Sequence, residues 1–287
     1  MLREATLEEV EAYLPFAYEL SQDLSTSFFP TYLDGIKTKA DFYNTAHKSF
    51  SDPNCKILLF LYDNQILGWI DYYFIPEDLY LSFHVFNVIK GYEQAIEEFI
   101  IYAKENYSGY TLYFGLPSKN ISSIDYLKYI EACKLEESFV YTLNFDNYTP
   151  MDYAGKIVRV NGENWIDFKE LHDKVEGMYW NSERLLKALN NPAKNTWNIY
   201  LLYENGRAIA SIYYIYTPIL VEIFGIDYID GKFDKKVMRN LLVKALNQSK
   251  LDMQKHMVFF VGDEEKDVLD DIGFDYLDRY ELYVINL

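Results

Sequence analysis

Two ionisable side chains lie on strand-like stretches whose other residues are largely apolar. Glu222 stands in VEIFGID at 221–227, and His84 stands in a similar stretch at 79–86. Burial among apolar side chains raises the pKa of a carboxyl group, so Glu222 is a candidate proton acceptor near neutral pH. The alternative for Glu222 is a strand-edge residue that faces solvent, and for His84 it is a hydrogen-bonded core histidine.

A single glycine precedes a helix-like stretch twice, in VIKGYEQA at 88–95 and in YIDGKFDKK at 228–236. Free N–H groups and the positive end of a helix attract phosphate, and glycine lets the backbone approach it closely. Lys232, Lys235 and Lys236 give the second loop a slight positive excess, whereas the charges of the first loop balance. A plain turn is the alternative interpretation of both glycines.

Other catalytic chemistry has little support in the sequence. The four histidines are scattered, and Cys55 and Cys133 are too few for a four-ligand zinc site or a disulfide framework. No metal is therefore expected. The chain has no GxSxG motif, no P-loop and no dinucleotide fingerprint.

The elements that would position these residues occur twice. LYDNQILGWIDYYFIP at 61–76 has a counterpart in LYENGRAIASIYYIYTP at 202–218, and each predicts a strand, a tight turn and a second strand. Capping patterns at Thr6–Glu9 and Thr38–Asp41 predict two helices before the first hairpin. The order strand, two helices, hairpin, strand, helix, strand, helix, strand fits both halves. We infer an internal duplication of one α/β unit.

This order, together with IGFDYLDRYELYVI at 272–285, resembles the GCN5-related N-acetyltransferase (GNAT) superfamily, whose members end with a short helix, a Gly-Phe pair and a strand. The resemblance implies an α/β (α+β) protein of two tandem units. Each unit is expected to hold a mixed, mostly antiparallel sheet of about six strands flanked by helices. A linker around Pro150 places the domains at 1–148 and 153–287. Little chain follows the last helix of each half, so we expect six-stranded halves or a strand exchanged between them.

In this superfamily the pantetheine of acyl-CoA lies between two splayed strands, and the loop before the next helix holds the pyrophosphate. The resemblance therefore implies acetyl-CoA as the acyl donor. The implied binding residues in the second half are Ile226, Gly231, Lys232, Phe233 and Asp234, and the first-half alternative is Gly91 and Tyr92.

The resemblance also implies catalytic roles. Glu222 is the base in the second half, and His84 and Tyr126 are the base and the acid of the first-half alternative. Leu269 stands where the superfamily usually has a tyrosine acid, so the second half lacks that residue.

The leading hypothesis is an acyl-CoA-dependent N-acyltransferase, in the first place an N-acetyltransferase, that acts on an unidentified small-molecule or peptide amine. One alternative is a degenerate, non-catalytic tandem module that binds a metabolite or a protein, because neither loop keeps the full glycine signature. A Fem-type aminoacyl transferase, which uses charged tRNA, is a second alternative. The net charge of −17 argues against it.

The net charge and the length of the apolar runs limit which partners and which cellular location we expect. With 27 Lys and Arg against 44 Asp and Glu, the surface is expected to repel phosphate backbones, so no nucleic-acid partner is expected. The apolar runs are far shorter than the roughly 20 residues of a membrane helix, and the opening MLREATLEEV does not fit a signal peptide. We expect a cytoplasmic protein without a membrane partner.

Overall fold

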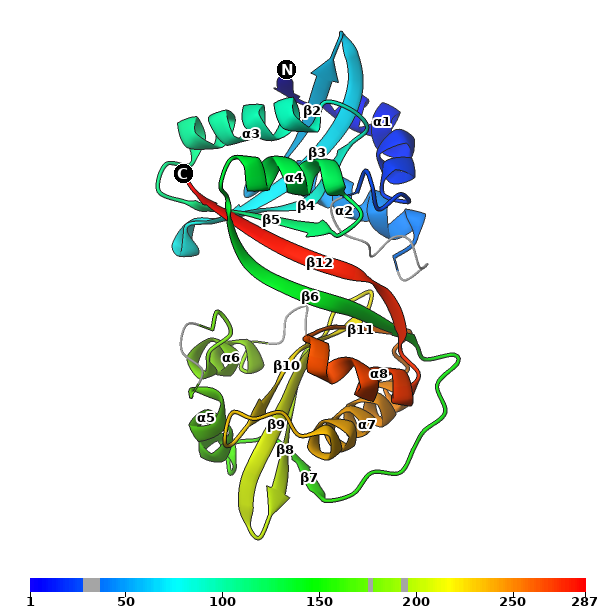
Figure 1. The fold of residues 1–287 in the computed structure, drawn as a ribbon, viewed down its shortest axis with the longest axis vertical. Helices are drawn as coiled ribbons and strands as arrows, with labels where there is room; N and C mark the ends of the chain where they lie inside the picture. Colours follow the sequence, from blue (N-terminus) through cyan, green and yellow to red (C-terminus); the bar gives the residue numbers. More distant parts are fainter. Residues whose placement is uncertain (28–36, 175–177, 192–195) are drawn as a thin grey trace. The chain divides into compact units, whose positions relative to one another are not determined.

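The protein folds into two compact units that repeat one element order (Figure 1). The computed structural model describes residues 1–27, 37–174, 178–191 and 196–287. Unit 1 comprises residues 1–138 and 278–287, and unit 2 comprises residues 139–277. Strands and helices alternate as the repeated sequence pattern predicts, which confirms the expected fold class.

Unit 1 is a mixed sheet with the strand order β1-β2-β3-β4-β5-β12. β4 and β5 are parallel, and each other neighbouring pair is antiparallel. Its elements before the crossing strands are β1 (Leu2–Glu4), α1 (Leu7–Leu20), α2 (Lys39–Ser51), β2 (Cys55–Tyr62), β3 (Gln65–Ile75), the 3-10 turn η1 (Pro76–Asp78), β4 (Tyr80–Val88), α3 (Tyr92–Asn106), β5 (Thr111–Pro117) and α4 (Ile121–Tyr129).

Unit 2 repeats this arrangement with the strand order β6-β11-β10-β9-β8-β7. β10 and β11 are the parallel pair, and the remaining pairs are antiparallel. Its elements between the crossing strands are β7 (Lys156–Arg159), α5 (Trp165–His172), α6 (Ser182–Leu189), β8 (Thr196–Glu204), β9 (Arg207–Tyr216), β10 (Val221–Tyr228), α7 (Lys235–Leu251), β11 (His256–Val261), the 3-10 turn η2 (Asp263–Glu265) and α8 (Lys266–Ile272).

Local sequence signals explain where the elements begin and turn. The predicted capping boxes are present at the first residues of α1 and α2. The turn of the β2–β3 hairpin has positive φ at Asp63 and Asn64, and the β8–β9 turn has it at Asn205 and Gly206. Two successive positive φ angles form the tight turn whose twist matches two antiparallel strands.

Alternating strand side chains separate two cores in each unit. In unit 1, α1 and α2 cover the face that carries Trp69 and Val85, and α3 and α4 cover the face that carries Ile70 and Tyr72. In unit 2, α5 and α6 pack on one face of the sheet, and α7 and α8 pack on the other. In unit 1, the strand side chains that point toward α1 and α2 therefore lie on the opposite face of the sheet from those that point toward α3.

The last strand of each sheet comes from the other half of the sequence. The chain passes from unit 1 to unit 2 within β6 (Cys133–Asn144) and returns within β12 (Asp275–Asn286). In unit 1, β12 pairs with β5 from Tyr280 onward, and in unit 2, β6 pairs with β11 from Phe139 onward. The expected six strands and the expected exchange are both confirmed. The domain limits 1–148 and 153–287 remain a prediction, since the two compact units assign each crossing strand to the sheet it completes.

Candidate functional site

The parallel strands of each unit separate after a short paired stretch. In unit 1 the pairing of β4 with β5 ends at Leu81–Leu112, although β4 continues to Val88. In unit 2 the pairing of β10 with β11 ends at Ile223–Phe259. Strands that separate leave backbone N–H and C=O groups with which an extended ligand can pair.

A one-residue bulge lies near the point where each pair of strands separates. In unit 1 the register of β3 with β4 shifts just after Asp71, which leaves His84 as the extra residue. In unit 2 the register of β9 with β10 shifts between Ile223 and Gly225, which leaves Phe224 as the extra residue. Bulges re-aim a side chain and are frequent next to active sites. His84 and Phe224 are therefore structural equivalents.

A carboxylate and a hydroxyl hold the imidazole of His84. Its Nδ1 lies 3.2 Å from Asp71 Oδ1 and 3.1 Å from Ser49 Oγ, and its ring stacks on Tyr73 with 4.7 Å between centroids. Because a carboxylate accepts hydrogen bonds, the network places the proton on Nδ1 and a lone pair on Nε2. Within the described ranges no residue hydrogen-bonds Nε2, and the side chain is 35% exposed.

The partner of His84 is fully buried. The Asp71 side chain is 1% exposed, and this burial raises the pKa of its carboxyl group, while the hydrogen bond and charge of His84 partly offset the rise. A carboxylate in this position orients an imidazole and stabilises the imidazolium that forms when Nε2 takes a proton. The pair can act as a general base.

The equivalent bulge of unit 2 carries an aromatic side chain. The ring of Phe224 lies 5.0 Å from that of Trp197 and 6.2 Å from that of Trp180, measured between centroids. Glu222 is half-buried on β10, between strands β9 and β11, so it stands on an inner strand of the sheet. The only carboxylate or imidazole at a bulge in the described part of the chain is thus that of unit 1.

Unit 2 has a histidine–aspartate pair of its own, but this pair is closed. His172 Nδ1 lies 2.9 Å from Asp227 Oδ2, and its Nε2 donates to the carbonyl oxygen of Trp180 at 2.7 Å. Burial lowers the pKa of His172, but Asp227 and the Trp180 carbonyl outweigh this effect and raise it. The ring is 0% exposed and both nitrogens are used, so this pair fastens α5 to β10.

The helix that follows β4 begins without a side-chain cap. The N-cap of α3 is Gly91, whose φ is 79°. A Cβ at this position would lie 2.7 Å from the Tyr62 ring, so the loop requires glycine. Lys90 lies beside it, with Nζ 5.2 Å from the centroid of the same ring. Uncapped N–H groups next to a cation form a favourable site for phosphate.

Carboxylates occupy the corresponding loop of unit 2. Asp234 caps α7 and accepts hydrogen bonds from the N–H groups of Lys236 and Val237, both at 2.9 Å. Asp230 accepts from the N–H of Lys232 at 3.1 Å. A phosphate at this loop would have to displace these carboxylates and would be repelled by them.

The segment after α1 binds to the edge of the separated strands of unit 1. The backbone carbonyls of Ser25–Ser27 accept hydrogen bonds from groups at the end of β4 and at the starts of α3 and α4. The donors are the Val88 N–H at 3.2 Å, the Tyr92 hydroxyl at 3.1 Å and the Asn120 side-chain amide at 2.9 Å. The chain's own backbone therefore uses donors that border this part of the sheet.

The first-half residues predicted for the site fall into two groups. His84, Gly91 and Tyr92 lie on β4 and at the start of α3, where the strands separate. Tyr126 instead lines a hollow of about 500 Å³ with Ile130 and other residues of α3, α4 and β12. No contact recorded for the described residues joins Tyr126 to His84, and both roles remain predictions.

The second-half residues surround the loop after β10. Ile226 and Gly231 line a hollow of about 370 Å³, and Phe233 packs on Tyr228 with 6.3 Å between ring centroids. Lys232 and Asp234 lie in the loop whose N–H groups the carboxylates occupy. Leu269 is fully buried in the core. These assignments too remain predictions.

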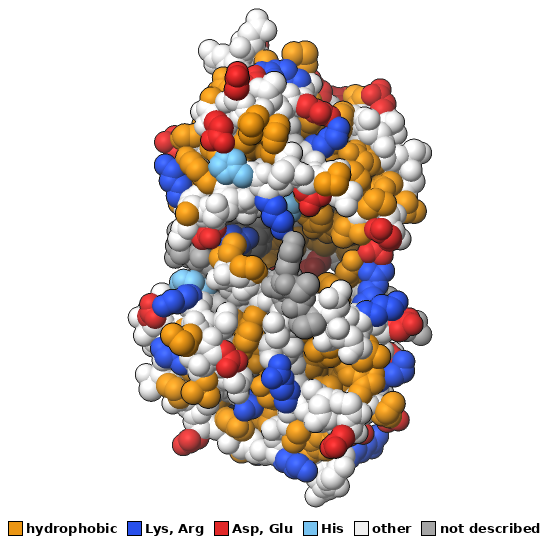
Figure 2. Space-filling model, turned by 180° about the vertical axis from the view of Figure 1, so that it is seen from behind, with side chains coloured by type: hydrophobic (Ala, Val, Ile, Leu, Met, Phe, Trp, Pro, Cys, Tyr) orange, Lys and Arg blue, Asp and Glu red, His pale blue; other side chains and the backbone are white. Residues whose placement is uncertain are grey.

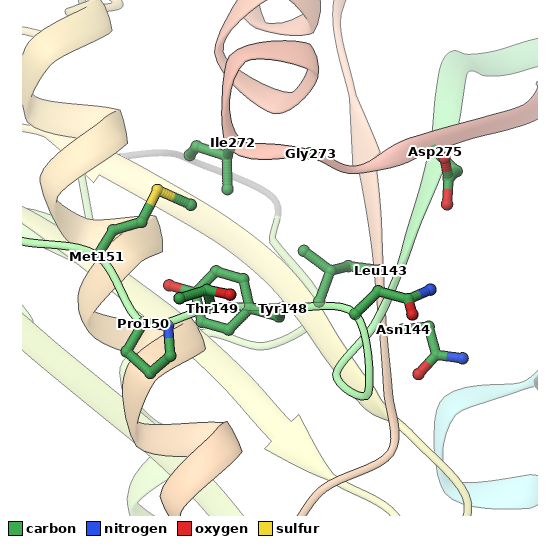
Figure 3. Close-up of a pocket in the computed structure, with 10 residues that line it drawn as sticks. Leu143, Asn144, Tyr148, Thr149, Pro150, Met151, Ile272, Gly273 and Asp275 are labelled. Atoms are coloured by element: carbon green, nitrogen blue, oxygen red, sulfur yellow. The ribbon is translucent and has the colours of Figure 1, made fainter.

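A hollow of about 330 Å³ lies under the linker. Figure 3 shows Tyr148, Thr149, Pro150 and Met151 along it, with Ile272 and Gly273 across from them. The side chain of Asn247 on α7 fixes the linker, because it accepts from the Tyr148 hydroxyl at 2.8 Å and donates to the Met151 carbonyl at 2.8 Å. This hollow therefore lies beside an anchored linker.

Sequence reasoning missed Asp71 and the buried pair His172–Asp227. A usable signal was present, because Asp71 and Asp227 each follow an isoleucine and precede a tyrosine within an apolar strand. A carboxylate in such a run needs a partner when it is buried. The scattered histidines were the available partners.

Other kinds of site find no support in the described ranges. There, no three or more His, Cys, Asp or Glu side chains are grouped so as to hold a metal ion. No helix in the same ranges is long and apolar enough to cross a membrane. On the face drawn in Figure 2, acidic and basic side chains are interspersed.

No protein-family model matches the chain, and no curated protein matches it in sequence. Solved structures do match its fold. A GCN5-related N-acetyltransferase from Sphaerobacter thermophilus aligns with a TM-score of 0.65 and 11% identity, over 99% of this chain and 95% of that one. A tandem GNAT protein from the clavulanic acid biosynthesis pathway aligns with a TM-score of 0.58 and 12% identity, over 99% and 98%. The tandem GNAT fold is therefore confirmed.

Proposed function

We propose that the protein is an acyl-CoA-dependent N-acyltransferase, in the first place an N-acetyltransferase, and that unit 1 carries the reaction. The observation that carries this proposal is His84, whose side chain is partly exposed on a bulge where β4 and β5 separate, with Asp71 behind it. The shared fold of the acetyltransferases supports the reaction class. The acceptor is a small-molecule or peptide amine.

The residues of unit 1 fit an acyl-CoA donor, which supplies an acyl group activated as a thioester. The uncapped first turn of α3, Gly91 and Lys90 would hold the pyrophosphate. Backbone groups of β4 beyond Leu81 would pair with the amides of the pantetheine arm. The hydrogen bonds that the carbonyls of Ser25–Ser27 now accept from the Val88 N–H and the Tyr92 hydroxyl would have to break when the donor binds.

His84 performs the proton transfer in this proposal. Nε2 takes the proton of the acceptor ammonium, Asp71 stabilises the resulting imidazolium, and Ser49 and Tyr73 hold the ring. The amine nitrogen then forms a bond to the thioester carbon and becomes positively charged, the C–S bond breaks, and the thiolate leaves with the electron pair and takes up the second proton of the amine nitrogen.

A second donor site in unit 2, with Glu222 as base and Gly231 in the loop, remains the alternative. Its loop has room, because nothing lies within 4 Å of a Cβ built at Gly231. The carboxylates of Asp230 and Asp234 favour, for this unit, the other candidate function, a degenerate, non-catalytic module that binds a metabolite or a protein. A Fem-type aminoacyl transferase lacks a supporting observation of this kind.

Titration calorimetry with acetyl-CoA, followed by an assay of thiol release with a panel of primary amines, tests the function. We expect saturable binding and amine-dependent thiol release. Absence of heat at millimolar acetyl-CoA would overturn the enzyme proposal and leave the binding module.

A further inference from the structure

The hollow beside His84 has a lining that suits a particular kind of amine. Its volume is about 260 Å³, and its lining includes Tyr73, whose ring stacks on His84, and Phe74. The hydroxyl groups of Thr45 and Ser49 lie in the same lining. A hollow of this size accommodates a small molecule, whereas a peptide chain needs a longer groove.

Two opposite charges complete the lining. Lys48 lies in the last turn of α2, and its Nζ makes no ion pair with any described residue. Asp52 follows the helix, and its carboxylate accepts the N–H of Asn54 at 2.9 Å, which fixes it in the turn. One cation and one anion match a ligand that carries both charges, whereas a diamine would leave its second ammonium beside Lys48.

We propose that this hollow binds the acceptor and that the acceptor is a small zwitterionic amine, with the size and charge of an amino acid. Lys48 pairs with the carboxylate of the ligand, Asp52 attracts its ammonium group, and the Tyr73 ring covers its side chain. His84 lines the same hollow and receives the proton. The role of this ligand as acceptor rests on the proposed acyl transfer. Its binding does not, because Lys48 and Asp52 would bind the ligand whether or not a reaction follows.

Paired ligands that differ only in the carboxylate test this assignment by calorimetry. The pairs are L-serine with ethanolamine and L-phenylalanine with phenethylamine. For at least one pair we expect the amino acid to bind about tenfold more tightly, and we expect Lys48→Glu to remove that difference. Lys187→Glu is the matched control, because Lys187 occupies the last turn of the equivalent helix α6. Equal binding within both pairs, or a preference that survives Lys48→Glu, would overturn the inference.

Cys55 supplies a second readout that does not depend on folding of the Lys48 variant. It is half-buried in the hollow, and burial, Asp52 and Asp71 raise the pKa of its thiol to about 11. In a Cys133→Ser background, the amino acid should slow alkylation of Cys55, and unchanged alkylation at saturating ligand would count against the inference. If ligand binding depends on Lys48 but acetyl-CoA yields no transfer, the proposed function fails and the binding site stands.

Discussion

Two histidine–aspartate pairs within the described residues use the same side chains but differ in access. His84 and Asp71 sit on neighbouring strands of unit 1 with Nε2 left open, whereas His172 and Asp227 join a helix to a strand of unit 2 with both nitrogens occupied. His172 is 0% exposed, and the His84 side chain is 35% exposed. The same two side-chain types can therefore form a candidate base in one unit and a structural hydrogen bond between a helix and a strand in the other.

The loops that follow the separated strands differ in the same direction. α3 of unit 1 has glycine at its N-cap and no side-chain cap, whereas Asp234 caps α7 of unit 2. The duplicated elements have diverged at two places, the bulge and the loop, and at both places unit 1 keeps groups that suit a reaction with an anionic donor. This difference yields four predictions.

The largest expected effect concerns the two glycines. Gly91→Glu adds bulk against the Tyr62 ring and a negative charge at the uncapped turn, so calorimetric binding of acetyl-CoA should fall by about a hundredfold or more. Gly231→Glu, also at positive φ, should leave the affinity within about twofold. Lys90 is exposed, so Lys90→Glu reverses the charge at this turn without the clash that Gly91→Glu causes, and it should also weaken acetyl-CoA binding. A loss in Gly231→Glu alone would move the donor site to unit 2.

The second effect concerns the two candidate bases. His84→Gln keeps a polar side chain but cannot take up a proton, so kcat should fall by about a hundredfold while acetyl-CoA still binds. Glu222→Gln should change kcat by less than about twofold. Steady-state kinetics with any accepted amine measures both. The opposite ranking of the two variants would assign the base to unit 2.

The third effect is on stability and concerns the closed pair. The pKa of His172 is raised above its usual 6.5, so the pair stabilises the fold fully at a pH below that value and loses this contribution as pH rises through the folded pKa. Urea unfolding should show a free energy of unfolding that declines as the pH rises above 6.5. His172→Gln should cost about 2 kcal/mol at low pH and flatten this decline. Equal slopes in wild type and His172→Gln would refute the assignment.

The smallest effect concerns the segment that borders the proposed donor site. Asp23 Oδ1 accepts from the Ser25 N–H at 2.8 Å and from its hydroxyl at 2.7 Å, which shapes the turn that carries Ser25–Ser27. Asp23→Ala should loosen this segment and strengthen acetyl-CoA binding by about threefold, since the carbonyls compete with the ligand for the same donors. Asp230→Ala, the loop aspartate of unit 2, serves as the control. Weaker binding by Asp23→Ala would show that the segment supports the site.

Much of the fold could be predicted from the sequence because its signals are local. The hairpin turns at Asp63–Asn64 and Asn205–Gly206 and the capping box at Thr6 depend on residues within a few positions of one another. The strand exchange was expected because too little chain follows each last helix. Which residues of β6 and β12 cross between the units depends on long-range pairing, and no local pattern encodes it.

The site was harder to predict because it depends on register. Asp71 and His84 meet through the pairing of β3 with β4, where His84 is the extra residue of a bulge, and the sequence does not mark that position. The capping role of Asp234 could have been foreseen, because aspartate is among the residues preferred at a helix N-cap. Its effect is to place a carboxylate where the resemblance implied a phosphate.

Hydrogen exchange with and without acetyl-CoA tests most directly whether unit 1 carries the donor site. Bound acetyl-CoA would cover amides of β4 beyond Leu81 and of the first turn of α3, so peptides spanning 82–95 should exchange more slowly in its presence. Peptides spanning 222–237 should exchange at an unchanged rate. Protection confined to 222–237 would contradict the account and assign the donor to unit 2.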